Sequence, residues 1–265
     1  ITLAAWTVRV MALRRNAGRV LEPSCGDGAF VRRLPGCTAI EVDARHCPPG
    51  ALNQDFFAYP ESEKFATIIG NPPYVRYQDI AETTRAWLPG EHFDGRSNLY
   101  LFFIEKCLRH LEPGGELIFI TPRDFLKATS AVNLNRLLYA AGTITDLIEL
   151  GDARIFDGAT PNCAIWRFEQ GNFSRRTRYE AGGSTDERHF LYAGGHLAFT
   201  HADYTVPLAE VFSVKVGAVS GADAIFASDR HGTMDFVCSH TAKTGQTKRM
   251  IFQTPHPALK RHKKA

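Results

Sequence analysis

A short apolar run that stops at a glycine and two prolines constrains this chain more than any other stretch. Phe65-Ala66-Thr67-Ile68-Ile69 has the length and composition of a buried strand, and Gly70 ends it. The next four residues, Asn71-Pro72-Pro73-Tyr74, therefore leave the end of a strand as a loop. Open α/β sheets bind their ligands where the strands end, so we expect this tetrad to carry the chemistry of the protein.

The tetrad is suited to hold an amino group. Each proline fixes its own φ and keeps the preceding residue extended, which makes the loop stiff. Since prolines have no N–H, the side-chain oxygen of Asn71 and a backbone carbonyl can act as two acceptors with few donors nearby. Two such acceptors would draw the N–H bonds of a nucleobase amine out of the ring plane and free its lone pair for attack. Tyr74 offers a face on which the base can stack, worth roughly 1–3 kcal/mol. A proline-stiffened turn with a surface tyrosine is the alternative.

Strands and helices alternate along the first 170 residues, which predicts an α/β fold with a doubly wound, mostly parallel sheet. The last two strands are joined by a connection too short for a helical crossover, so we expect an antiparallel strand at one edge. Residues 75–96 show no clear periodicity and predict a mobile loop over the site. The first expected strand ends at Glu22, and the others lie at 38–43, 51–54, 65–69, 116–120, 144–150 and 162–168. The expected helices lie at the start of the chain, after the glycine turn, at 98–110 and at 131–141.

A glycine-rich turn follows the first strand and indicates a ligand-binding loop. Gly26 and Gly28 allow the backbone to approach a ligand closely. The turn lacks the third glycine of the dinucleotide fingerprint, and Glu22 at the strand end would repel a pyrophosphate. A carboxylate at this position suits a cofactor that carries a cation or an amine.

Two further acidic residues follow the second and third strands. Glu41 stands where nucleotide-binding folds place a carboxylate on ribose hydroxyls. Asp55 could accept a hydrogen bond from an adenine amino group, while Phe56 or Phe57 covers the ring. Packing in the core is the alternative for both aromatic residues, and we favour it for Phe57.

Composition argues against a membrane protein and against a disulfide-stabilised one. No apolar run approaches the ~18 residues that span a bilayer, and no signal peptide opens the chain. The six cysteines form no C-x-x-C pair and have no matching histidine spacing, which favours free thiols in a reducing cytoplasm and no metal site. Seven basic residues and no acidic ones lie between Thr241 and Ala265. Nucleic acid would suit this cluster, and a solvated tail explains it equally well.

Taken in order, these segments resemble a known family. The chain looks like a Rossmann-like, S-adenosylmethionine-dependent DNA methyltransferase acting on adenine N6. Within that group it resembles the Taq-type, gamma-class branch found in restriction–modification systems. There the cofactor motifs precede Asn-Pro-Pro-Tyr, and a target-recognition domain follows. The matching segments are 21–28, 40–43, 54–56, 71–74, 97–100 and 111–115.

The resemblance implies S-adenosylmethionine as the cofactor and adenine in duplex DNA as the target. The implied contacts to the cofactor are Glu22, Ser24, Cys25, Gly26 and Gly28 for its methionine part, Glu41 for the ribose, and Asp55 and Phe56 for the adenine. Asn71 and the Pro72 carbonyl, supported by Pro73, would grip N6 of the target. Tyr74 would stack on the flipped base. Phe168 matches the second base-contacting aromatic residue, with core packing as its alternative.

The resemblance also implies two domains and a fragment. A change of composition near Val206 predicts a methyltransferase domain at 1–206 and the beginning of a recognition domain at 207–265. In this family a Thr-Pro motif that touches the cofactor lies just before the position where this chain starts, and the recognition domain runs well past Ala265. We therefore expect part of the cofactor site and most of the recognition domain to be missing from this chain. A cognate restriction endonuclease is the implied partner.

Two other functions are compatible with the same residues. A methyltransferase that modifies protein glutamine or an RNA base would use the same tetrad, but the segment 22–28 is more similar to the DNA enzymes. A non-catalytic DNA-binding component would keep the fold as a scaffold only. The complete tetrad argues against that second alternative.

Overall fold

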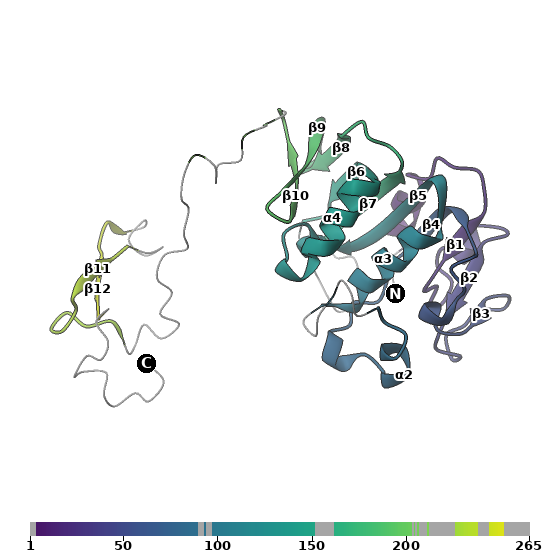
Figure 1. The fold of residues 1–265 in the computed structure, drawn as a ribbon, viewed down its shortest axis with the longest axis horizontal. Coiled ribbons are helices and arrows are strands. Elements are labelled where there is room, and N and C mark those ends of the chain that lie inside the picture. Colours follow the sequence, from purple (N-terminus) through teal and green to yellow (C-terminus); the bar gives the residue numbers. More distant parts are fainter. Residues whose placement is uncertain are drawn as a thin grey trace. The chain divides into compact units, whose positions relative to one another are not determined.

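The computed structural model describes residues 4–89, 93, 97–151, 162–202, 204, 206, 211, 226–237 and 244–251. The chain divides into two compact units, Ile1–Thr205 and Val206–Ala265. In the part of the second unit that the structure describes, two short antiparallel strands are present, β11 (Met234–Phe236) and β12 (Lys248–Met250). The first unit contains the large sheet and the residues of the predicted site (Figure 1).

Ten strands among the described residues form the sheet of the first unit. Their order is β10 (His196–Thr200), β9 (Ser184–Ala193), β8 (Arg176–Ala181), β6 (Gly142–Glu149), β7 (Cys163–Gln170), β5 (Leu111–Pro122), β4 (Phe65–Gly70), β1 (Val20–Glu22), β2 (Thr38–Glu41) and β3 (Leu52–Asn53). The run from β5 to β3 is parallel, and β7 is antiparallel to both of its neighbours. The mostly parallel sheet and the antiparallel pairing of β6 with β7 are confirmed. The strand β7 lies inside the sheet, because β8, β9 and β10 extend the sheet beyond β6, and the edge strand β10 pairs antiparallel with β9.

Among the described residues, three helices cover the sheet, as the sequence predicts: α1 (Ala4–Met11), α3 (Leu99–His110) and α4 (Val132–Ala141). Asn98 caps α3, since its side chain accepts a hydrogen bond from the backbone N–H of Tyr100 at 3.4 Å. None of the helices in the described part of the chain is long and apolar enough to span a bilayer.

Alternate residues of the central strands point to opposite faces of the sheet and form two hydrophobic layers. Ile68 and Leu117 belong to the layer that includes α3 and α4, whereas Ile69 and Ile118 belong to the layer that includes α1. Figure 1 shows α3 and α4 side by side on the near face of the sheet. The central strands are therefore buried on both faces, which is why they read as continuous apolar runs.

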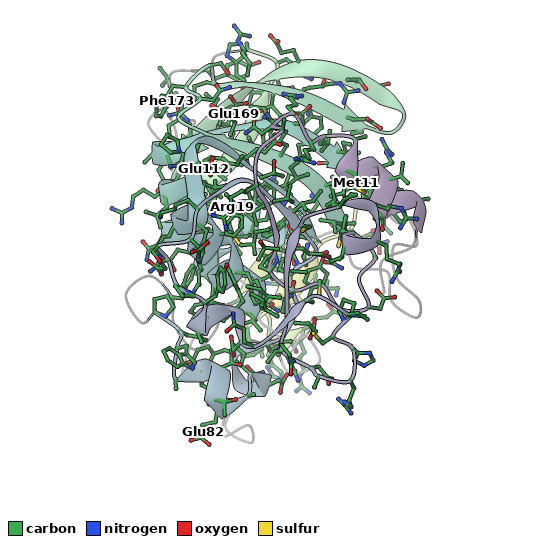
Figure 2. The ribbon with its side chains drawn as sticks, turned by 90° about the vertical axis from the view of Figure 1, so that its right-hand side faces the viewer. Met11, Arg19, Glu82, Glu112, Glu169 and Phe173 are labelled. Atoms are coloured by element: carbon green, nitrogen blue, oxygen red, sulfur yellow. The ribbon has the colours of Figure 1, made fainter. Side chains whose placement is uncertain are left out.

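Two stretches differ from the expected secondary structure. The turn after β1 leads into a short 3-10 turn, η1 (Val31–Arg33), instead of an α-helix, because Pro35 disfavours helical geometry in the residue before it. The expected loop at 75–96 contains η3 (Tyr77–Asp79) and α2 (Glu82–Arg85), while 90–92 and 94–96 lie outside the described residues. Figure 2 shows Glu82 of α2 at one end of the first unit and Phe173, after β7, at the other.

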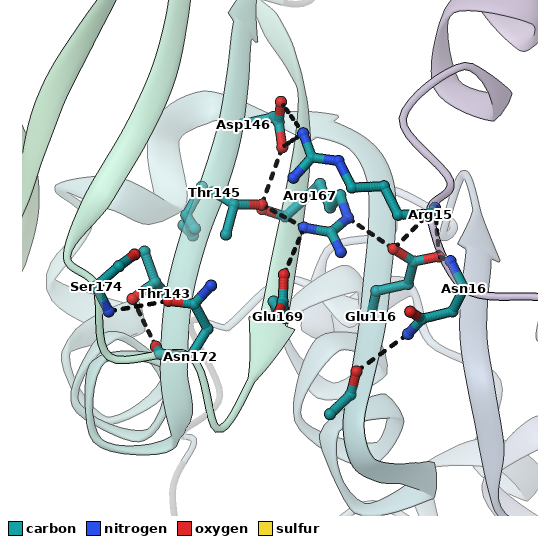
Figure 3. Close-up of polar contacts among 12 residues, drawn as sticks. Arg15, Asn16, Glu116, Thr143, Thr145, Asp146, Arg167, Glu169, Asn172 and Ser174 are labelled. Carbon is teal, nitrogen blue, oxygen red and sulfur yellow. Dashed lines mark hydrogen bonds and ion pairs between the residues drawn. The ribbon is translucent and has the colours of Figure 1, made fainter.

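A cluster of buried charges ties the segment after α1 to the sheet (Figure 3). Arg167 and Glu116, which are 2% and 0% exposed, form an ion pair at 2.6 Å. Glu116 also accepts hydrogen bonds from the backbone N–H groups of Arg15 and Asn16, at 3.0 and 2.9 Å. The Arg15 guanidinium pairs with the buried Asp146 at 2.8 Å. Because a buried charge is costly unless it is paired and hydrogen-bonded, this arrangement depends on every member being present.

Replacing Arg167 with methionine tests the cluster. The change leaves Glu116 buried without its cation, which we expect to lower the free energy of unfolding by about 3–5 kcal/mol. The matched control is Arg176→Met, which removes an exposed ion pair to Glu187 at 3.3 Å and is expected to cost at most about 1 kcal/mol. Urea unfolding followed by circular dichroism measures both. Equal losses in the two variants would contradict a special role for the buried cluster.

Candidate active site

The candidate site lies at the edge where the parallel strands β1, β2 and β4 end. Glu22, Glu41 and Gly70 are the last residues of these strands. Two cavities lie at this edge: an aromatic cavity of about 270 Å³, lined in part by Phe56, and an acidic cavity of about 290 Å³, lined in part by Glu22. The lining residues common to both cavities are Ser24, Gly26 and Asn71.

Glu41 joins the glycine turn to β2. One of its carboxylate oxygens accepts a hydrogen bond from the backbone N–H of Gly26 at 2.8 Å, and the other accepts one from the N–H of Asp43 at 2.9 Å. The turn requires its glycines, because Gly26 and Gly28 have φ of 51° and 82°. Each oxygen of Glu41 has a second lone pair, and the residue lines the aromatic cavity, so it can accept hydrogen bonds from a ligand there.

Asp55 and two phenylalanines form a second wall of the aromatic cavity. Asp55 caps the 3-10 turn η2 (Phe56–Ala58) by accepting a hydrogen bond from the N–H of Phe57 at 2.8 Å, and its other oxygen accepts one from the hydroxyl of Thr84 in α2. Phe56 is 2% exposed and stacks on Phe103 with ring centroids 5.2 Å apart. Both Phe56 and Phe57 line the cavity, so the structure gives Phe57 the same kind of position as Phe56.

The acidic cavity contains a buried carboxylate. Glu22 is 1% exposed, and its Oε2 atom has no hydrogen-bond partner among the described residues. Burial raises the pKa of Glu22 to about 8, and the nearby Asp27 and Glu41 add to the rise. His46 and Asp27 also line this cavity. A cationic ligand group would supply the partner that Glu22 lacks.

The thiols near the site are not poised as nucleophiles. Burial raises the pKa of Cys25 to about 12 and that of Cys163 to about 11. Both groups are therefore protonated at neutral pH, and a thiol is a much weaker nucleophile than a thiolate. Ser24 has a different role, because its hydroxyl donates to the backbone carbonyl of Asn71 at 3.3 Å and so links the glycine turn to the tetrad.

Three hydrogen bonds hold the tetrad at 71–74 and the residue that follows it, Val75. Besides the bond from Ser24, the Tyr74 hydroxyl donates to the carbonyl of Ile120 in β5 at 2.8 Å, and the carbonyl of Val75 accepts from the N–H of Leu99 at 2.8 Å. Asn71 lines both cavities and Pro73 lines the aromatic one, while Pro72 is buried. The Tyr74 ring is partly buried, 5.9 Å from Tyr100 in an edge-on arrangement. Burial raises the pKa of its hydroxyl well above the ordinary value, so the anchoring proton stays in place.

Phe168 is not brought to the site. It is 0% exposed and lies in the hydrophobic layer below α3 and α4. Because β7 is antiparallel, its first residue, Cys163, lies beside the tetrad, with its sulfur 4.0 Å from the Tyr74 hydroxyl. Phe168 is five positions further along, roughly 17 Å away at about 3.4 Å per residue. In the structure Phe168 therefore packs in the core, as the alternative has it, and its contact with a base stays a prediction.

Some residues of the cavities were missed by sequence reasoning, among them Phe103, Thr84 and His46. Phe103 lies one helical turn after Leu99, which also lines the aromatic cavity, so helical spacing could have indicated it. Thr84 falls in a segment without periodicity, and His46 in an irregular connection, so neither carried a signal. Among the residues that the structure describes, no group of three His, Cys, Asp or Glu side chains could hold a metal ion.

Comparison with known proteins shows what the chain is similar to. Residues 47–156 match the family described as Eco57I restriction-modification methylase. The type II methyltransferase M.HincII of Haemophilus influenzae is 28% identical over 180 residues, covering 64% of this chain and 36% of that protein. M.TthHB8I of Thermus thermophilus is 31% identical over 182 residues, covering 59% and 40%. The predicted resemblance to methyltransferases of restriction–modification systems is confirmed, and the chain spans less than half the length of these relatives.

Solved structures show the same fold at low sequence identity. A modification subunit of a putative type I restriction enzyme from Vibrio vulnificus aligns with a TM-score of 0.54 and 12% identity, over 66% of this chain and 45% of that one. The M protein of the type I restriction enzyme EcoKI aligns with a TM-score of 0.52 and 14% identity, over 66% and 44%. The predicted Rossmann-like sheet is therefore confirmed.

Glu22 should titrate near pH 8 in the ligand-free protein. The pKa of Glu22 is 4.5 in the unfolded chain and about 8 in the folded protein, so between these values only the folded protein holds the proton. The stability that this proton contributes is fully present at low pH and is lost as the pH rises through about 8. A Glu22→Gln variant, which stays neutral, should gain stability relative to the wild type between pH 5 and pH 9, by an amount on the order of a few kcal/mol.

Chemical denaturation across that pH range measures the difference, with Glu187→Gln as the control because Glu187 is 65% exposed. The free energy of unfolding of the control should change with pH in the same way as that of the wild type. A difference between Glu22→Gln and the wild type that does not change with pH would contradict the raised pKa.

Proposed function

Because this chain resembles the DNA methyltransferases of restriction–modification systems and shares the fold of their modification subunits, we propose that it is the catalytic part of a site-specific DNA methyltransferase. Its reaction is the transfer of a methyl group from S-adenosylmethionine to N6 of an adenine flipped out of duplex DNA. The observation that carries the proposal is the junction of two cavities at Asn71. One cavity suits a nucleoside, the other suits an amino acid, and the amine-binding tetrad stands between them.

The residues present fit the cofactor in two halves. In the aromatic cavity, Glu41 would accept hydrogen bonds from the ribose hydroxyls, Asp55 from the adenine amino group, and Phe56 with Phe57 would contact the ring. In the acidic cavity, the unpaired oxygen of Glu22 would accept a hydrogen bond from the ammonium of the methionine part. When bound, S-adenosylmethionine supplies an electrophilic methyl group on a sulfonium centre.

The tetrad would prepare the amine of the target base. The side-chain oxygen of Asn71 and the carbonyl of Pro72 would accept hydrogen bonds from the two N–H groups of this amine. They would thereby direct the lone pair of its nitrogen toward the cofactor. The three hydrogen bonds that fix the loop mean that these oxygens need not reorganise during the reaction, which is how preorganised dipoles lower a barrier. The protonated thiols of Cys25 and Cys163 support direct transfer to N6 without a covalent enzyme intermediate.

Tyr74 would stack on the flipped base. Its hydroxyl donates to the carbonyl of Ile120, which fixes the position of the ring close after Asn71 in the chain. Flipping costs a few kcal/mol, and stacking of roughly 1–3 kcal/mol with the hydrogen bonds at the base edge offsets that cost. A tyrosine held by its hydroxyl loses little further freedom when the base arrives.

We assign the methyltransferase domain to residues 1–206 and the beginning of a target-recognition domain to 207–265. The seven basic residues after Thr241 support contact with the phosphates of duplex DNA. A cognate restriction endonuclease that reads the same DNA sequence is the proposed partner, and the cytoplasm is the proposed compartment.

Replacing Asn71 with alanine tests the reaction directly. In the full-length protein, methyl transfer to duplex DNA should fall by about 10²–10³-fold, because one of the two acceptors for the amine is removed. Affinity for S-adenosylhomocysteine should stay within about threefold, since the carboxylates that hold it are intact. Labelled methyl transfer measures the first quantity and calorimetry the second.

Asn172→Ala is the matched control, because Asn172 lies in the turn after β7 at the opposite end of that strand from the tetrad. The wild-type protein should methylate duplex DNA in preference to RNA and to protein glutamine. Preferred methylation of RNA or protein, or near-normal turnover by Asn71→Ala, would refute the proposal.

A further inference from the structure

Lys106 is the one lysine in the described part of the chain that is buried, with 5% exposure. It lies in α3, and its ammonium donates hydrogen bonds to the carbonyls of Phe57 at 2.7 Å and Tyr59 at 2.9 Å. The same ammonium lies 5.2 Å from the ring centroid of Phe56. A buried ammonium is costly unless its N–H groups are used, so these contacts form a site built for a cation.

Lys106 and Asp55 hold opposite ends of η2. Asp55 accepts a hydrogen bond from the N–H of Phe57 at the start of the turn, and Lys106 donates to the carbonyls at its end. An anion at the start and a cation at the end both match the direction of the backbone dipoles. Phe56 and Phe57, which η2 carries, line the aromatic cavity beside Asp55 itself. The position of this wall therefore depends on Lys106.

The neighbouring charged groups favour a charged Lys106, and the nearby basic side chains of α3 bind other partners than η2. Burial lowers the pKa of Lys106, while the carboxylates of Glu61 and Asp55 favour its charged form. Arg109, in the next turn of α3, pairs instead with Glu61 at 2.9 Å. His110 is also buried, and its lowered pKa keeps it neutral, with Nδ1 bonded to the carbonyl of Glu63 at 2.8 Å.

We infer that Lys106 is a positioning residue that sets how the proposed cofactor site discriminates a 6-amino purine from a 6-oxo purine. The inference rests on the proposed function. Asp55 can accept a hydrogen bond from a 6-amino group, whereas a 6-oxo group is itself an acceptor and the N–H of that ring lies at N1. A site built to bond an N–H at one position disfavours an analogue that carries its N–H elsewhere. That rejection requires Asp55 to be held in place, and Lys106 holds the turn that Asp55 caps.

The test compares the affinities of S-adenosylhomocysteine and S-inosylhomocysteine, measured by calorimetry on the full-length protein. The wild type should bind the adenosine compound more tightly. Lys106→Met keeps an unbranched apolar side chain but removes the ammonium and both of its hydrogen bonds, and the ratio of the two affinities should fall by about tenfold. Lys106→Gln, a smaller perturbation that retains N–H donors, should give an intermediate ratio. If Lys106→Met does not fold, the affinity ratio of Lys106→Gln tests the inference instead.

Two controls separate positioning from general destabilisation. Leu138→Ala makes a cavity in the core beneath α4 and should lower stability without changing the ratio. Lys64→Met removes an exposed lysine that donates to the carbonyl of Arg109, and it should also leave the ratio unchanged.

The outcomes distinguish the inference from the function on which it rests. A wild type that binds neither compound would overturn the proposed function and the inference with it. A wild type that discriminates, together with Lys106 variants that discriminate equally well, would overturn the inference alone. A fall in the ratio for Leu138→Ala as large as that for Lys106→Met would also overturn it.

Discussion

The parallel hydrogen-bond ladder that joins β2, β1 and β4 is the constraint on which the site depends. The register aligns Glu22 with Ala39 and Leu21 with Ile68, so the ends of these strands reach the same edge. Residues that are about 50 positions apart in the chain, such as Glu22 and Asn71, then line one cavity. Side chains alone could not hold this arrangement, because each loop would have to be ordered separately. The ladder orders them together.

Two buried glutamates of the same sheet differ in role: one stabilises the fold and the other lines a cavity of the candidate site. Glu116 accepts hydrogen bonds from two backbone N–H groups, the Thr67 hydroxyl and the Arg167 guanidinium, so its charge is fully compensated. Glu22 has an oxygen without a partner, and its pKa is raised to about 8. The first belongs to the structural cluster, away from the cavities. The second lines one of them, and its uncompensated burial is what makes it responsive to a cationic ligand.

Some of the site could be predicted because local sequence decides it. The stiffness of the tetrad follows from its prolines, the glycine turn from its two positive-φ glycines, and the acidic strand ends from the position of Glu22 and Glu41. Phe168 could not be placed in this way. Its distance from the site depends on the direction and register of β7, and a strand of similar composition running the other way would put it beside the tetrad. The burial of Lys106 could not be predicted either, because a lysine on an amphipathic helix is usually exposed to water.

The sequence by itself determined that strands and helices alternate, that a rigid tetrad with acceptor groups follows a buried strand, and that acidic residues end the neighbouring strands. These properties depend on backbone sterics and on burial patterns a few residues long, which neighbouring residues settle among themselves. Only the tertiary structure decided that the antiparallel strand β7 lies inside the sheet, that two cavities meet at Asn71, and that a buried ammonium in α3 holds the turn next to Asp55. Those features require segments far apart in the chain to pack together, and packing depends on shape and pairing that no short stretch contains.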